Sequence, residues 1–180
     1  MTALTVWTHG DGLLSVLGPI GLAAAAGTAL VIDLDPNGPS NRGAGSLAAL
    51  VRSGPRLDDL RPSVAGPALL ANGGIEPEAA EPVVRALIGG WPAVVLRSPD
   101  ERGHFAPVVP VYPLMPGLLA SSPDRFCVFQ RTGFPAEPGG EGIVLPRPGS
   151  GTIQRLLTGS LPVGSKWIRA WRRVWEHPWR

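Results

Sequence analysis

Residues 4–36, LTVWTHGDGLLSVLGPIGLAAAAGTALVIDLDP, decide the fold. They predict a buried strand at Leu4–Thr8, a glycine turn at residues 9–12, a helix at about Ser15–Ala26 and a second strand at Ala29–Leu34. The glycine that follows the helix is a common helix terminator. A strand, a glycine turn, a helix and a strand in succession are typical of the start of an α/β fold with a parallel sheet.

The same alternation continues along the chain. It predicts further helices at Ser46–Arg52, 76–88 and Thr152–Thr158, and further strands at Ala68–Ala71, Pro92–Leu96, Val108–Tyr112, Phe126–Gln130 and Ile143–Leu145. We therefore expect a mainly parallel, doubly wound sheet with helices on both faces over residues 1–163, followed by a C-terminal amphipathic helix over residues 164–180.

A second interpretation of the N-terminal stretch is a transmembrane helix. Residues 13–32 carry no charge and are numerous enough to span a bilayer. However, the run contains several glycines and a proline, and no Lys or Arg precedes it because the first is Arg42. The sequence favours a buried helix and strand, with a membrane span at 13–32 as the alternative.

The counts of lysine, cysteine and histidine exclude several classes of site. Of the 16 basic residues 15 are arginine, and the one lysine is Lys166. No Schiff-base or P-loop lysine can therefore lie in residues 1–165. The single cysteine, Cys127, excludes an internal disulfide or a multi-cysteine zinc site, and three well-separated histidines do not suggest a metal site.

Several motifs follow the order of a known ATPase family. Residues 8–15, THGDGLLS, occupy the position of a phosphate loop, and residues 31–38, VIDLDPNG, are close to a switch segment of the form I-D-x-D-P-x-G. The stretch 91–99 lies where a Walker B strand would be, and residues 144–146 with 159–162 are similar to an "L-P-x-D … G-x-P" end. The chain resembles the ParA/MinD-like P-loop ATPases, including their CpaE and TadZ branch.

The departures from this family's pattern bear on function. The resemblance implies lysines at the positions of Thr8 and Leu13, a magnesium-binding threonine at Leu14 and a Walker B aspartate at Arg97. In the loop, the residues that match are Gly10, Gly12 and Ser15.

Without lysines or the metal ligand, a phosphate loop cannot neutralise the charge of a transferring phosphoryl group. Asp11 adds a negative charge inside the loop, and Asp33 and Asp35 remain as switch-like carboxylates. We therefore expect a non-catalytic pseudo-ATPase that has no metal site and does not use ATP or Mg²⁺ as cofactors.

Simpler or opposite interpretations exist for the same residues. The glycines are typical of a tight turn, and Asp33 and Asp35 could cap the turn that follows the strand. His9 fits a surface residue and Cys127 a small buried one. In the enzyme alternative, a divergent loop still binds and hydrolyses nucleotide, with Asp33 organising the metal.

Charge is concentrated at the C-terminus. Residues 166–180 carry a net charge of +4, whereas the preceding 165 residues carry −2. At helical spacing an apolar stripe faces away from a basic side. The stripe comprises Trp167, Ile168, Trp171, Val174 and Trp175, and the basic side includes Lys166, Arg169, Arg172 and Arg173.

Such a helix has three possible uses. It could lie on an anionic membrane surface, as the basic C-terminal helices of MinD-like proteins do, it could dock into a protein partner, or its apolar stripe could pack on the body of the protein. Nucleic acid is not expected to be a partner, because few cations are available and the body is acidic. The resulting hypothesis is that the chain is a cytoplasmic adaptor or positioning protein with a protein partner. Homodimer formation and peripheral binding to the inner membrane face are further possible interactions.

Overall fold

The computed structural model of the chain describes residues 3–9, 12–38, 45–56, 58–62, 66–117, 125–162 and 164–179. Within these residues, seven strands form one sheet, and every pair of neighbouring strands runs parallel. The order across the sheet is β3-β2-β4-β1-β5-β6-β7. The strands are β1 (Ala3–Thr8), β2 (Ala29–Asp33), β3 (Pro67–Leu70), β4 (Val94–Arg97), β5 (Val108–Leu114), β6 (Cys127–Arg131) and β7 (Gly142–Leu145).

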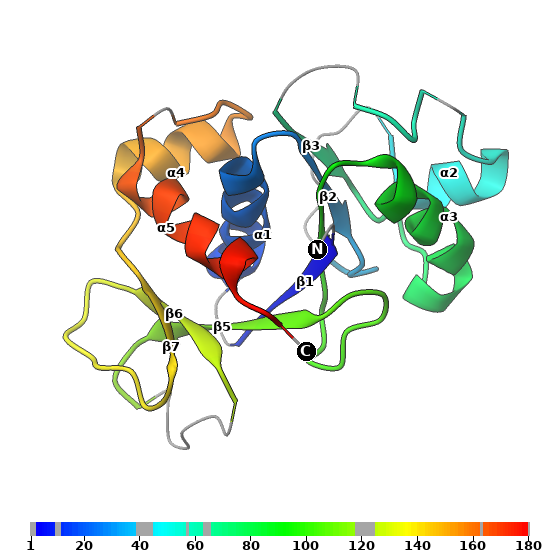
Figure 1. Cartoon of the computed structure of the whole chain (residues 1–180). Coiled ribbons are helices and arrows are strands. Elements are labelled where there is room, and N and C mark those ends of the chain that lie inside the picture. Colours follow the sequence, from blue (N-terminus) through cyan, green and yellow to red (C-terminus); the bar gives the residue numbers. More distant parts are fainter. Residues whose placement is uncertain are drawn as a thin grey trace.

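Helices cover both faces of this sheet (Figure 1). One face carries α1, α4 and α5, and the other carries α2 and α3. The helices of the described residues are α1 (Gly12–Ala26), α2 (Leu47–Ser53), α3 (Pro77–Gly90), α4 (Ser150–Leu157) and α5 (Lys166–Glu176). The predicted α/β class with a doubly wound parallel sheet is therefore confirmed.

Some element boundaries differ from the prediction. α1 begins at Gly12, three residues before the predicted start, and the Ser15 hydroxyl donates to the Gly12 carbonyl oxygen within this first turn. α3 continues through Gly90, and the N–H of Trp91 still donates to the carbonyl oxygen of Leu87 at 3.1 Å. Glycine lowers helix propensity, but the packing of the rest of the helix outweighs this preference.

The apolar run at residues 13–32 is explained by the position of α1. This helix packs on the sheet and, along another side, on α5, so it buries side chains in two directions rather than along one stripe. The following strand, β2, is buried along its whole length. No helix among the described residues is long and apolar enough to cross a bilayer.

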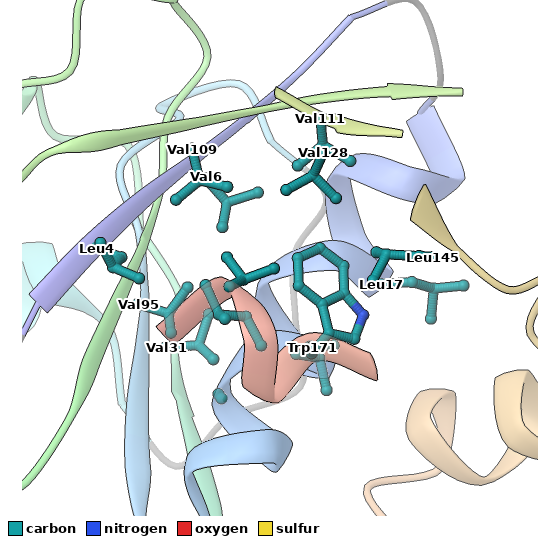
Figure 2. Packing of buried hydrophobic residues seen from close by; sticks show 14 of the residues in the cluster. Leu4, Val6, Leu17, Val31, Val95, Val109, Val111, Val128, Leu145 and Trp171 are labelled. Carbon is teal, nitrogen blue, oxygen red and sulfur yellow. The ribbon is translucent and has the colours of Figure 1, made fainter. Parts of the chain in front are cut away.

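The C-terminal helix α5 packs against α1 and contributes large side chains to the core. Trp167, Trp171 and Val174 are each no more than 2% exposed. Figure 2 shows the indole of Trp171 inside the cluster formed by the strands and α1. The close approach of the two helices depends on Gly21 of α1, where an added Cβ would lie 2.5 Å from the Trp167 ring and 2.7 Å from Trp171 Nε1.

We expect Gly21→Ala to lower the free energy of unfolding by about 1–3 kcal/mol, the usual cost of overpacking a core. Alanine has the better helix propensity, so propensity alone predicts the opposite sign. Gly89→Ala in α3 is the matched control, because nothing lies within 4 Å of its added Cβ. Urea denaturation of both variants measures the difference, and equal effects would contradict the packing of α5 on α1.

Candidate functional site

The candidate site lies where β2 and β4 end next to the start of α1. Asp33 is the last residue of β2 and Arg97 the last of β4. The strand register pairs these two residues directly. Because the carboxyl ends of parallel strands meet at one edge of the sheet, this is the edge at which α/β proteins usually bind ligands.

The guanidinium of Arg97 bridges two carboxylates and α1. Its Nη1 donates to Asp33 Oδ1 at 2.7 Å, and its Nη2 donates to Asp35 Oδ2 at 3.1 Å. Its Nε donates to the backbone carbonyl oxygen of Ser15, in the first turn of α1, at 3.2 Å. Arg97 is 9% and Asp33 2% exposed, so this pair is almost entirely removed from water, whereas Asp35 is half-buried.

Burial raises the pKa of Asp33 above its ordinary value. The N–H of Asp35, which donates to Asp33 Oδ1 at 3.0 Å, and the Arg97 guanidinium offset only part of this effect. The carboxyl group of Asp33 thus depends on Arg97 for charge compensation. Removing the guanidinium would leave a buried acid without a counter-ion.

The two aspartates also organise the turn after β2, as the capping interpretation predicts. Asp33 Oδ1 accepts a hydrogen bond from the N–H of Asp35, and Asp35 Oδ1 accepts one from the N–H of Asn37 at 3.0 Å. The turn then brings Gly38 against the guanidinium, where a side chain would overlap Arg97 Nη1 and come 3.0 Å from Asp33 Oδ2. Glycine is required here for close approach rather than for an unusual backbone angle.

We expect Gly38→Ala to displace the guanidinium and to lower the free energy of unfolding by about 1–3 kcal/mol. The reason is steric, since the added methyl group competes with a buried, hydrogen-bonded cation. Thermal or urea denaturation measures the loss. Gly45→Ala, where nothing lies within 4 Å of the added Cβ, serves as the control. A Gly38→Ala protein as stable as the control would contradict this geometry.

The phosphate-loop residues can be placed only in part. Gly10 and Asp11 lie outside the described residues. Gly12 begins α1, and the hydroxyl of Ser15 donates to the carbonyl oxygen of Gly12 at 2.8 Å. The Ser15 hydroxyl therefore bonds within its own helix, and the group of Ser15 that reaches the site is its carbonyl oxygen.

Arg97 engages one oxygen of each carboxylate at this site, Asp33 Oδ1 and Asp35 Oδ2. A metal ion held by these two oxygens would have to displace the guanidinium. Leu13 and Leu14, in the first turn of α1, have apolar side chains without a metal-binding group. Among the described residues, no group of three or more His, Cys, Asp or Glu side chains is arranged to hold a metal ion.

The proposed contact residues of the C-terminal helix divide into two sets. Trp167, Trp171 and Val174 are buried in the core. The prediction that these three residues contact a membrane or a partner is therefore wrong. The structure shows the alternative, in which the apolar stripe packs on the body of the protein. The half-buried Ile168 and Trp175 pack against the same cluster. The exposed residues of α5 include Lys166, Arg169, Arg172 and Arg173.

Two further sequence interpretations can be checked. Cys127 is fully buried, and burial raises the pKa of its thiol to about 11, so it is not a reactive thiolate near neutral pH. His9 is an exposed residue whose ring lies 5.7 Å from that of Trp7 and 5.8 Å from that of Tyr112. Both fit the simpler structural interpretations.

Sequence reasoning identified Arg97 as a replacement but not as a partner of Asp33 and Asp35. The available signal was charge: an arginine ends one apolar strand, and two aspartates follow another.

Comparison with known proteins adds no identification, since no protein-family model matches the chain and no curated protein shows a significant match.

Proposed function

We propose that this protein is a non-catalytic, ParA/MinD-like pseudo-ATPase that acts as an adaptor or positioning protein in the cytoplasm. The observation that carries the proposal is the Arg97 guanidinium held between Asp33 and Asp35. It compensates, from within the chain, the carboxylates that a P-loop enzyme would use with a metal ion. The parallel α/β fold is compatible with a P-loop ancestry.

The physical argument concerns the transition state of phosphoryl transfer. Catalysis of this reaction rests on cations that neutralise charge on the transferring group. The cation at this site is already paired with two carboxylates, and the loop offers leucines in place of the lysine and metal ligand. The charges at this edge of the sheet are thus paired within the chain, which supports a site that does not carry out phosphoryl transfer.

Calorimetric titration with ATP and Mg²⁺ tests the pseudo-ATPase proposal. We expect no binding at micromolar concentrations and no phosphate release. Asp33→Asn is the matched control, since it keeps the shape of the side chain and removes its charge. Micromolar binding and phosphate release by the wild-type protein, both lost in an Asp33→Asn variant that circular dichroism shows to be folded, would establish the enzyme alternative, in which Asp33 organises a metal ion.

The adaptor surface that we favour is the exposed basic side of α5. Its cations are Lys166, Arg169, Arg172 and Arg173, all solvent-exposed and all on a helix whose apolar side is already used by the core. Contact with an anionic membrane or an acidic protein would therefore be electrostatic, without insertion of tryptophan. Each basic residue near an anionic bilayer contributes about 1 kcal/mol, so binding should weaken steeply with salt.

Co-sedimentation with phosphatidylglycerol vesicles tests this surface. Removing α5 would unfold the core, so charge reversal is the proper variant. We expect the wild-type protein to pellet at low salt and the Arg169→Glu, Arg172→Glu, Arg173→Glu triple variant to remain in solution. The control reverses three exposed arginines elsewhere, Arg52, Arg56 and Arg155. Equal pelleting of both triple variants would remove α5 from the proposal and leave protein partners or a homodimer to other surfaces.

A further inference from the structure

A cavity lies at the same edge of the sheet as the Arg97 network. Its volume is about 550 Å³, within the size range of small-molecule sites. This open cavity is lined by residues of α1, by the first turn of α4, by the chain leaving β6 and β7, and by Trp167 of α5. It therefore opens where loops follow the carboxyl ends of parallel strands.

The floor of this cavity is apolar. It is formed by Leu13, Leu14 and Leu17 of α1, Ile153 of α4 and the ring of Trp167. Leu13 is 49% exposed although it is a large hydrophobic side chain in the first turn of a buried helix. Covering such a surface would be favourable for an apolar group of a ligand.

The polar side chain of Gln130, which also lines the cavity, is held by three hydrogen bonds within the protein. The Gln130 side chain donates to the carbonyl oxygens of Arg131 and Pro146 at 2.7 and 2.9 Å. Its Oε1 accepts the indole N–H of Trp167 at 2.7 Å. Trp167 thus presents only its ring to the cavity, and Gln130 has no free polar atom to bind a ligand.

The rim of the cavity is cationic. Arg131 and Arg147 both line it, and none of its described lining residues is an acid. Arg131 makes one long, exposed contact to Glu137 at 3.8 Å, and no ion pair of Arg147 is seen among the described residues. The first turn of α4 also lines the cavity and has no side-chain cap, and helix N-termini favour negative charge.

We propose that this cavity binds a small amphiphilic anion, with its apolar body on the leucine–tryptophan floor and its charged head between Arg131 and Arg147. The proposal follows from the pairing of apolar lining residues with two arginines, of which Arg131 has one long, exposed ion pair with Glu137. A free inorganic anion would leave the floor uncovered, and a neutral hydrocarbon would leave the arginines without a partner. Both parts of the ligand are needed for affinity.

Fluorescence titration with 1-anilinonaphthalene-8-sulfonate, an aromatic anion of this class, tests the proposal. We expect saturable binding with one site per chain, displaced by dodecyl phosphate but not by inorganic phosphate or dodecyltrimethylammonium. Arg131→Gln and Arg147→Gln should each weaken binding about ten-fold, the size of one charge-assisted hydrogen bond. Leu13→Ser should weaken binding without unfolding the protein, because Leu13 is half exposed.

The matched control is Arg155→Gln, an exposed arginine of α4 that does not line the cavity. Its affinity should equal that of the wild-type protein. Loss of affinity in Arg155→Gln as large as in Arg147→Gln, or unchanged binding in the Arg131→Gln, Arg147→Gln double variant, would overturn the proposal. The assay contains neither nucleotide nor metal, so its outcome does not depend on whether the protein is a pseudo-ATPase.

Discussion

Replacing Arg97 with methionine is expected to lower the free energy of unfolding by about 3–5 kcal/mol, the usual cost of breaking a buried ion pair from one side. The variant removes the guanidinium that bridges Asp33, Asp35 and the Ser15 carbonyl oxygen. Asp33, at 2% exposure, is left charged and uncompensated in the core. Urea denaturation followed by circular dichroism measures the loss.

Two companion variants separate charge from packing. Asp33→Asn in the Arg97→Met background removes the stranded charge, so it should recover part of the lost stability. Arg97→Lys retains a positive charge but cannot donate three hydrogen bonds in a planar fork, and it should fall between wild type and methionine. If Arg97→Met were as stable as wild type, the guanidinium would not hold this edge together.

The pH dependence of these variants has a definite sign. Burial raises the pKa of Asp33 in the folded protein, so its contribution to stability is fully present below the unfolded value and is lost as pH rises through the folded pKa. Without Arg97 that pKa should rise further. The difference in the free energy of unfolding between wild type and Arg97→Met should therefore increase from about pH 4 to neutral pH. When both proteins also carry Asp33→Asn, this difference should no longer change with pH.

The sequence was sufficient to predict the fold because its signals are local. Glycine turns, apolar strands and helical periodicity located β1, α1 and β2, and the remaining elements followed at nearly the observed positions. The Asp33 segment could also be placed at a strand end. Its pairing with Arg97 could not, because 64 residues separate the two and β4 enters the sheet between β1 and β2.

The role of the C-terminal helix illustrates the same limit. A helical wheel identifies an apolar stripe but not the surface that covers it. Here the cover is α1, whose Gly18 and Gly21 leave room for indole rings. From the sequence, the glycines of this apolar helix were interpreted only as evidence against a membrane span. Their structural role is to leave space for the tryptophan rings of α5. This role could not be predicted, because Gly21 and Trp167 are 146 residues apart in the chain.

The second large effect is expected in the tryptophan pair of α5. Trp171→Ala should lower the free energy of unfolding by about 3–5 kcal/mol, because it opens a cavity in the middle of the main cluster. Conservative replacements distinguish the two indoles further. Trp171 Nε1 is buried and has no hydrogen-bond partner among the described residues, whereas Trp167 Nε1 donates to Gln130 Oε1.

Trp171→Phe thus loses ring area and also removes an unpaired polar group, so its cost should stay below about 1.5 kcal/mol. Trp167→Phe leaves the Oε1 of the 4%-exposed Gln130 without its donor, which adds about 1–3 kcal/mol to a similar loss of area. Trp167→Phe should therefore be the less stable of the two by urea denaturation. The opposite order would contradict the observed pairing, in which Trp167 Nε1 donates to Gln130 Oε1 and Trp171 Nε1 has no hydrogen-bond partner among the described residues.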